Sequence, residues 1–324
     1  MIIGHDPAVG QFESAWRAGT LPHAWLLAGP RGVGKAHFAR VAATRVLADA
    51  AGPPAGLPGL GTPEEHPIAR LAAAGSHPDM RWLERAENPK TGALARNITV
   101  GQVRGLAELF DLTPSMSPWR AVVIDSADDL EPPAANALLK MLEEPPANCV
   151  FLLVSHAPGR LLPTVRSRCR RLDFQPLGDD AMTSLLEAQL PSMSAAERSG
   201  IVARAGGSVG RAMAFAALDL AKLQDAAARI LREGDPTNAR RSDLALELGR
   251  KGAGDRYAAF LDLVPPLIAG QARGLQGPPL ERALNAYAQA RELAVLAPRV
   301  SLDPASTVFQ LGGILASVAI RPVP

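Results

Sequence analysis

The fold of this chain is decided by the segment Gly29-Pro30-Arg31-Gly32-Val33-Gly34-Lys35-Ala36. It matches the phosphate-binding pattern G-x-x-x-x-G-K-[ST] at every defined position except the last. In such loops the glycines let backbone N–H groups turn toward a phosphate, the lysine reaches the outer phosphates, and the final hydroxyl ligates Mg²⁺. Ala36 offers a methyl group instead of that hydroxyl. The sequence therefore predicts a phosphate cradle that has lost one metal ligand.

The flanking residues favour a true phosphate loop. Residues 24–28 (Ala-Trp-Leu-Leu-Ala) are typical of a buried strand, and residues 37–47 are typical of a helix. A glycine-rich turn between a strand and a helix N-terminus favours anions, because its N–H groups are unpaired and the helix dipole is positive there. A turn that binds nothing has the same composition, so the sequence leaves open whether ATP or ADP occupies the loop.

Composition excludes several classes of protein. The 324 residues suffice for two or three domains, 47% are hydrophobic, and the net charge of +2 gives no chain-wide polyanion signature. Neither Cys149 nor Cys169 has a partner in a CxxC pair, which argues against disulfides and zinc. We find no secretory pattern at the start and no run of 18 uncharged apolar residues, so we expect a cytoplasmic protein without a membrane span.

Short apolar runs alternate with helical patterns as far as residue 175. The expected strands are 24–28, 80–84, 121–125, 150–155 and 171–175. Nearly continuous Val, Ile and Leu indicate strands buried on both faces of a parallel sheet, which predicts an α/β core in three layers.

Glycine, proline and helix-capping residues mark loops and helix ends between the expected strands. Residues 51–63 are rich in Gly and Pro and predict a loop, and Thr99 opens a capping box for a helix that we expect to end near residue 112. Pro132 and Pro133 fit the first turn of another helix, which Pro145-Pro146 ends.

Strand patterns stop after residue 176. We expect a core domain over 1–175, a small helical lid over 176–217, and about five further helices over 218–324.

A second chemical motif ends the strand at 121–125. In phosphate-loop proteins an aspartate like Asp125 helps to hold Mg²⁺. Hydrolysing ATPases also need an acid to orient water, usually at the next position, where this chain has Ser126. Asp128 and Asp129 follow, but we expect their carboxylates to point elsewhere. Because the metal-binding hydroxyl and the water-orienting acid are both missing, hydrolysis is not expected to be this chain's role.

Several segments together carry a family resemblance. Residues 136–146 (Asn-Ala-Leu-Leu-Lys-Met-Leu-Glu-Glu-Pro-Pro) and 164–169 (Thr-Val-Arg-Ser-Arg-Cys) resemble two motifs of bacterial clamp-loader subunits, and 76–79 (Ser-His-Pro-Asp) and 23–26 (His-Ala-Trp-Leu) also match. The resemblance covers roughly residues 1–215, whereas the last third agrees only in length and helical character.

The resemblance implies an AAA+ phosphate-loop core with a parallel five-stranded sheet, a helical lid and a C-terminal all-α collar for oligomerisation. It also implies a hetero-oligomer with gamma/tau and delta subunits that opens the sliding clamp and places it on primed DNA. The gamma/tau subunits carry a complete loop, an acid after the aspartate and a zinc-binding cysteine cluster. This chain departs at Ala36 and Ser126 and has no cysteine between residues 36 and 148. It therefore resembles a rigid, non-hydrolysing member, and no cofactor or zinc is required.

The resemblance also assigns residue roles. Arg168, within the motif Ser167-Arg168-Cys169, would reach into the nucleotide site of a neighbouring subunit as an arginine finger. A solvated basic run is the alternative, because Arg166 and Arg170 lie nearby.

Further candidates come from other elements. Ser155 ends an expected strand, and Arg211 lies one residue after the position where hydrolysing relatives carry a nucleotide-sensing arginine. Thr99 and Arg104 could contact a DNA backbone, although plain helix capping and a surface arginine explain them equally well.

Two other functions compete with this interpretation. An active AAA+ ATPase, resembling gamma/tau or a DNA branch-migration motor, conflicts with Ala36 and Ser126. A small-molecule phosphoryl-transfer enzyme explains residues 24–47 but neither the Ser-Arg-Cys motif nor the helical last third.

Overall fold

A computed structural model describes residues 2–54, 57–87, 94–218 and 220–319 of the chain. The chain divides into two compact units, Met1–Gly210 and Arg211–Pro324. The sheet and the helices that follow it as far as residue 210 belong to the first unit. The expected domain boundaries at 175 and 217 stay predictions.

The first unit is built on a five-stranded parallel sheet with strand order β2-β3-β4-β1-β5. The strands are β1 (Ala24–Ala28), β2 (Met80–Leu83), β3 (Arg120–Asp125), β4 (Cys149–Ser155) and β5 (Arg170–Asp173). The five expected strands are confirmed, with ends that differ from the expected ones by at most two residues. In register, Ala28 lies beside Ser155 and Asp125 beside Val154, so the carboxyl ends of β1, β3 and β4 meet at one edge of the sheet.

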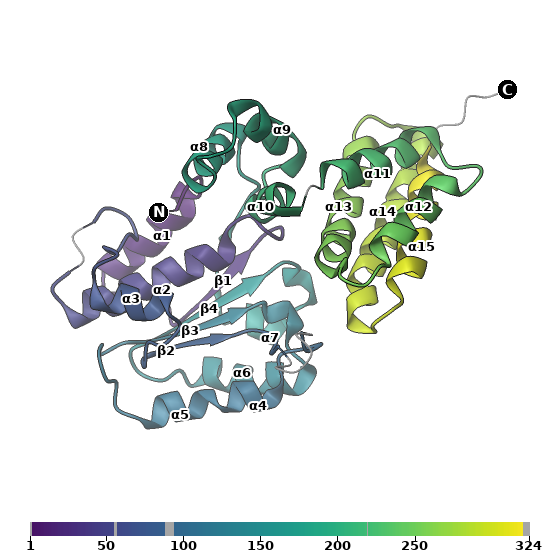
Figure 1. Ribbon diagram of the computed structural model, residues 1–324. Helices are drawn as coiled ribbons and strands as arrows, with labels where there is room; N and C mark the ends of the chain where they lie inside the picture. Colours follow the sequence, from purple (N-terminus) through teal and green to yellow (C-terminus); the bar gives the residue numbers. More distant parts are fainter. Residues whose placement is uncertain (1, 55–56, 88–93, 219, 320–324) are drawn as a thin grey trace. The chain divides into compact units, whose positions relative to one another are not determined.

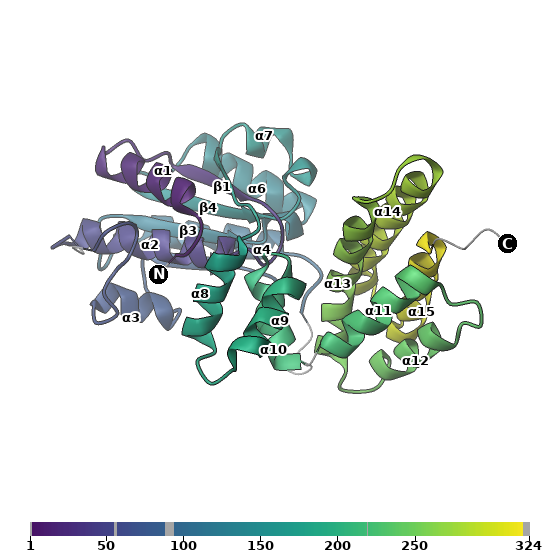
Figure 2. The same ribbon diagram turned by 90° about the horizontal axis from the view of Figure 1, so that it is seen from above.

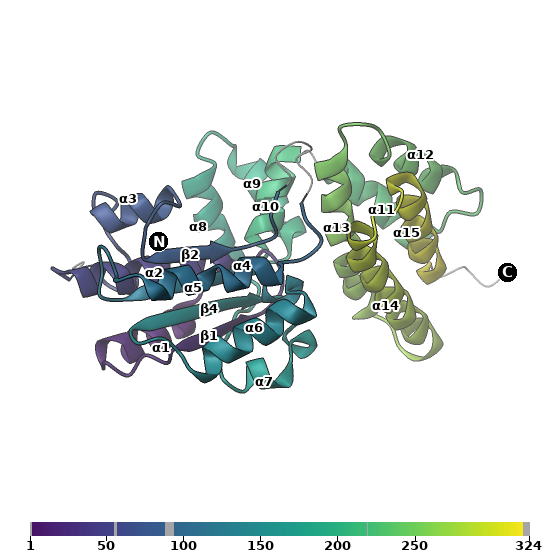
Figure 3. The same cartoon turned by 90° about the horizontal axis from the view of Figure 1, so that it is seen from below.

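Helices cover both faces of this sheet (Figure 1). On one face lie α1 (Asp6–Arg17), α2 (Lys35–Ala51) and α3 (Pro67–Ala73); on the other lie α4 (Val100–Arg104), α5 (Leu106–Asp111), α6 (Pro132–Glu143) and α7 (Pro163–Arg166). Figures 2 and 3 turn the molecule to show each face. Each face has its own buried apolar cluster, and the first is centred on the packed rings of Phe12, Trp25 and Phe38. The predicted three-layer core is confirmed.

The single helix expected from Val100 to about residue 112 is wrong. The chain forms two short helices, α4 and α5, which meet at Gly105. Glycine lowers helix stability and marks such breaks. The expected capping box is present, since Thr99 Oγ1 accepts from Gln102 N and the Gln102 side chain accepts from Thr99 N. The loop expected over 51–63 is present in part, and residues 55–56 lie outside the described residues.

The lid region consists of α8 (Asp179–Gln189), α9 (Ala195–Ala205) and α10 (Val209–Leu218), and α10 runs across the boundary between the units. Helix α9 begins with the expected capping box between Ser194 and Glu197. Gly206 ends it in the left-handed conformation with φ of 56°, which glycine adopts without strain.

The second unit is helical throughout its described elements. They are α11 (Ala221–Glu233), α12 (Ala239–Leu248), α13 (Gly254–Ala272), α14 (Gly277–Arg299) and α15 (Pro304–Val318). Helix α15 packs against the other four, and its buried face carries Val308, Leu311 and Leu315. Within the described part of the chain, no helix has the length and apolar character needed to cross a membrane.

Candidate functional site

The phosphate loop connects β1 to α2. Gly34 caps α2 with φ of 103°, and Gly32 has φ of 77°, both in the region that favours glycine. A Cβ atom on Gly32 would approach Ser208 Oγ to 2.4 Å. The glycines of the motif thus serve the turn itself and a close approach by the lid.

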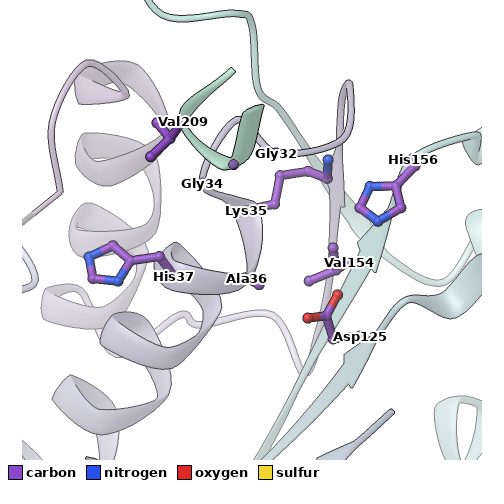
Figure 4. A pocket seen from close by; sticks show the side chains of 10 residues that line it. Gly32, Gly34, Lys35, Ala36, His37, Asp125, Val154, His156 and Val209 are labelled. Atoms are coloured by element: carbon purple, nitrogen blue, oxygen red, sulfur yellow. The ribbon is translucent and has the colours of Figure 1, made fainter. Parts of the chain in front are cut away.

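A pocket of about 320 Å³ opens at this loop. It is lined by Gly32, Gly34, Lys35, Ala36, His37, Asp125, Val154, His156, Val209 and Gly210. Figure 4 shows the Lys35 side chain extending toward the ends of β3 and β4, where Asp125, Val154 and His156 lie. The structure therefore brings together the phosphate loop, the aspartate that ends β3 and the start of α10, and the sequence predicted the first two of these.

Lys35 is tied to its own loop. Its side chain is buried, and Nζ donates to the carbonyl of Gly29 at 2.7 Å and to the carbonyl of Pro30. Burial lowers the pKa of Lys35 to about 8, although Asp128 and Asp125 act in the opposite direction. Two of the three ammonium donors are thus satisfied by the loop that would otherwise present them to phosphate.

The start of α10 closes over the loop. Gly210 N donates to the Gly32 carbonyl at 2.9 Å, and Ser208 Oγ donates to the Arg31 carbonyl at 3.3 Å. Ser208 is 4% exposed. Sequence reasoning missed this contact and treated the neighbourhood only as a place for a sensor arginine.

Asp125 stands at the end of β3 and faces the pocket. Burial and the neighbouring Glu84 carboxylate raise its pKa, while Lys35 and Arg31 lower it. The next residue, Ser126, is 5% exposed and donates its hydroxyl to Asp128 Oδ2 at 2.8 Å. At the position where a hydrolysing relative would orient water, this chain has a hydroxyl that is engaged in holding a neighbouring carboxylate.

Asp128 joins the ends of β3 and β4. Besides Ser126, its carboxylate accepts from Ser155 Oγ at 2.9 Å, His156 N at 2.6 Å and Ala157 N at 3.1 Å. Burial opposes ionisation, yet these hydrogen bonds together lower the pKa of Asp128. The candidate Ser155 is fully buried and contributes its hydroxyl to this network. Asp128 and Ser155 are thus placed to hold the sheet edge in shape.

His156 follows β4 directly and lines the pocket, and sequence reasoning missed it. Burial and the nearby charges of Lys35 and Arg31 lower its pKa to about 3, so the imidazole is neutral at pH 7. A signal existed, because ligand sites in parallel α/β sheets gather at the carboxyl ends of strands. His5 supports the loop through a 2.7 Å hydrogen bond between its Nε2 and the Val33 carbonyl.

The pocket offers few side chains that could bind a metal ion. Ala36 lines the pocket with a methyl group. Among the described residues, no three His, Cys, Asp or Glu side chains gather as a metal site. Of the usual Mg²⁺ ligands of a phosphate loop, Asp125 is therefore the one that this pocket presents.

Arg168 lies after α7, in the short segment that leads into β5. Its Nη2 is 2.7 Å from Glu143 Oε1, and its Nη1 donates to the Thr164 carbonyl at 3.0 Å. The side chain is 35% exposed. Ser167 Oγ donates to the same carbonyl, and burial raises the pKa of Cys169 to about 12, which keeps it a thiol.

The remaining candidates stay predictions. Arg211 falls in the second unit, where burial lowers its pKa and Asp262 opposes that shift. Thr99 caps α4 and Arg104 is exposed at its end. Neither feature by itself indicates DNA.

A sequence profile described as "DNA polymerase III, delta subunit" matches residues 4–178, more than half of the chain. The chain belongs to this clamp-loader family. The expected family resemblance is confirmed, and the AAA+ interpretation of the sheet and phosphate loop agrees with it.

Similar curated proteins come from several bacteria. DNA polymerase III subunit delta' of Pseudomonas aeruginosa is 38% identical over 186 residues, which cover 57% of this chain and 53% of the relative. Subunit delta' of Bacillus subtilis is 32% identical over 170 residues, covering 52% and 47%. Subunit tau of Bacillus subtilis is 29% identical over 186 residues, covering 56% and 30%. The chain thus spans about half or less of the length of these relatives.

Two solved structures from Thermotoga maritima have a distant overall likeness. One is a DNA polymerase III gamma subunit-related protein, 16% identical with a TM-score of 0.42, covering 94% of this chain and 98% of that one. The other is the RuvB Holliday junction branch migration motor, 18% identical with a TM-score of 0.40, covering 85% and 83%. Because both TM-scores are low, neither likeness adds to the family assignment.

Proposed function

We propose that this chain is a non-hydrolysing subunit of a DNA polymerase III clamp loader, and that Arg168 completes the ATPase site of a neighbouring subunit. One contrast carries the proposal. Lys35 is turned into its own loop, whereas Arg168 keeps a partly exposed guanidinium at the surface. The chain thus buries its own phosphate-binding cation, whereas Arg168, although paired with Glu143, keeps part of its guanidinium exposed for a nucleotide on another subunit.

Arg168 would act by charge. A guanidinium that reaches the transferring phosphoryl group spreads positive charge over its oxygens, and such arginines contribute about 10³–10⁵ in rate. At about 1.4 kcal/mol per decade, this corresponds to roughly 4–7 kcal/mol of transition-state stabilisation. Cys169 would contribute packing rather than charge to this motif, because its thiol stays protonated.

The chain's own pocket lacks the parts of a hydrolytic site. Ala36 supplies no metal ligand and the Ser126 hydroxyl is engaged by Asp128. ATP or ADP binding would have to free Lys35 Nζ from the Gly29 carbonyl and move Gly210 from Gly32. We therefore expect weak nucleotide binding that Mg²⁺ does not strengthen. Isothermal titration with ATP and ADP, with and without Mg²⁺, measures this.

The partners follow from the family. The relatives are named as delta', gamma and tau subunits, and we infer that this chain assembles with gamma/tau and delta subunits to act on a sliding clamp and primed DNA. The helical second unit would serve as the oligomerisation collar. Its exposed apolar side chains, such as Leu246 and Leu284, are suited to burial against other subunits.

Steady-state ATP turnover tests the proposal in two settings. The isolated chain is expected to show no turnover. A complex with its cognate gamma/tau and delta subunits, clamp and primed DNA is expected to turn over, and Arg168→Ala is expected to lower that rate without preventing assembly. Arg171→Ala, a nearby exposed arginine paired with Asp173, is the matched control. Robust turnover by the isolated chain would instead support the alternative of an active ATPase. An unchanged rate in the Arg168→Ala complex would overturn the proposed role of Arg168.

A further inference from the structure

We propose that Glu143 is a positioning residue for Arg168, holding the guanidinium so that its free donors face outward for a neighbour's phosphate. This inference rests on the proposed function of Arg168. Glu143 lies in the Leu-Glu-Glu-Pro-Pro part of residues 136–146, a segment for which the sequence indicated a family resemblance and the end of a helix but no role for Glu143.

Some N–H donors of the Arg168 guanidinium make hydrogen bonds within the described part of the chain, and the others do not. Arginine carries five N–H donors in a planar fork. One of them is directed at Glu143 Oε1, 2.7 Å from Nη2, and one at the Thr164 carbonyl, 3.0 Å from Nη1. Three donors remain for a ligand. Two anchors from different elements fix the plane of the fork, whereas a single anchor would let it rotate.

Both ends of the pair stand on rigid supports. Glu143 is the last residue of α6, directly after Leu142, which is 2% exposed. On the other side, Val165 of α7 is 3% exposed. Leu142 and Val165 belong to the same apolar cluster under the sheet, so the core fixes the spacing of the two backbones. The position of Glu143 is therefore set by packing rather than by a flexible loop.

The Glu143–Arg168 ion pair is better suited to orienting the guanidinium than to stabilising the fold. Glu143 is 43% exposed and Arg168 35%, and exposed ion pairs contribute little to folding. A pair that adds little stability can still limit the rotamers of the charged group, and pre-orientation lowers the entropy lost when that group engages a phosphate. The negative charge of Glu143 also discourages the Arg168 guanidinium from pairing elsewhere.

The isolated chain tests the anchor itself, independently of any partner. Arginine-selective NMR measures rotation of the Arg168 guanidinium, which is expected to be hindered in the native chain and faster in Glu143→Ala. Glu143→Gln keeps an acceptor and should recover part of the restraint. Asp173→Asn is the matched control, because it neutralises the carboxylate of another exposed pair, with Arg171. Rotation that is equally fast in the native chain and in Glu143→Ala would overturn the inference.

The assembled clamp loader tests the consequence through a double-mutant cycle. Glu143→Ala is expected to lower turnover at saturating ATP about 2- to 5-fold, the factor that an exposed pair of up to about 1 kcal/mol supplies. The same change in an Arg168→Ala complex should have no further effect, and the KM for ATP should change less than kcat. A loss that persists in the Arg168→Ala complex would show structural damage and overturn the inference, as would a rate that rises on removing Glu143. If Arg168→Ala itself leaves turnover unchanged, the proposed function fails and this inference with it, whatever the NMR result.

Discussion

Gly210 N donates to the carbonyl of Gly32, and this 2.9 Å hydrogen bond joins the first turn of α10 to the phosphate loop. The contact needs two glycines. A Cβ atom on Gly210 would lie 3.2 Å from Gly32 Cα, which is tighter than ordinary van der Waals contact. Two backbones thus meet where side chains would hold them apart. The lid rests on the loop because neither residue has a side chain.

Gly210→Ala is expected to lower the free energy of unfolding of the first unit by about 1–2 kcal/mol, since the new methyl group must displace the loop. Gly200→Ala is the matched control. Gly200 lies within α9, where an added Cβ meets nothing within 4 Å, so alanine should stabilise the helix by about 0.5–1 kcal/mol. Chemical denaturation followed by circular dichroism gives both values. Equal gains from the two substitutions would contradict the close contact.

Asp128→Ala is expected to cost about 2–4 kcal/mol of unfolding free energy. The substitution leaves the backbone N–H groups of His156 and Ala157 without their acceptor at a partly buried sheet edge. Asp111→Ala, at the exposed end of α5, should change stability by less than about 0.5 kcal/mol. Denaturant titration of both variants measures the difference. A cost for Asp128→Ala no larger than that for Asp111→Ala would rule out its joining role.

Strands β1, β3 and β4 could be predicted because each is a short, largely apolar run with clear ends. β4, for example, is buried along its whole length, and no other secondary structure explains Cys149–Ser155 so simply. The helix after Thr99 was predicted too long, although Gly105 gave a local signal for the break. Thr99 and Gln102 indicated the capping box that does form.

The residues of the site that belong to a known sequence motif could be predicted. Contacts between backbones that are far apart in the sequence could not. Lys35 and Asp125 were predicted at the pocket, and both line it. The Gly32–Gly210 hydrogen bond depends on tertiary packing between residues far apart in the sequence, which leaves no pattern in the chain. The hydrogen bonds from Lys35 to Gly29 and Pro30 are local, but the motif indicates a lysine that faces phosphate rather than its own loop. The Glu143–Arg168 pair joins two recognised motifs, but neither motif states that the other lies beside it.

Stability is expected to fall in acid partly through His156. Burial, Lys35 and Arg31 lower its folded-state pKa from 6.5 to about 3, so between these values the unfolded chain binds the extra proton. The free energy of unfolding therefore decreases as the pH falls from about 6.5 toward 3, by at most about 1.4 kcal/mol per pH unit from this group. His156→Gln should flatten that part of the curve. Parallel native and variant curves over this window would show that His156 is not held neutral.

Arg45 organises the loop after α2 in a way that the Gly- and Pro-rich composition of residues 51–63 did not reveal. Its side chain is 7% exposed; Nε pairs with Asp49 at 2.7 Å, and Nη1 donates to the carbonyls of Leu57 at 2.9 Å and Gly61 at 2.6 Å. Arg45→Lys is expected to cost about 1–3 kcal/mol and to speed proteolysis within this loop, because an ammonium cannot reproduce the planar fork that spans these acceptors. Arg17→Lys, in an exposed pair with Glu13 on α1, provides the control and should change stability by less than about 0.5 kcal/mol. Denaturation and limited thermolysin digestion measure the two effects. Unchanged cleavage in Arg45→Lys would mean that the loop keeps its shape without the arginine fork.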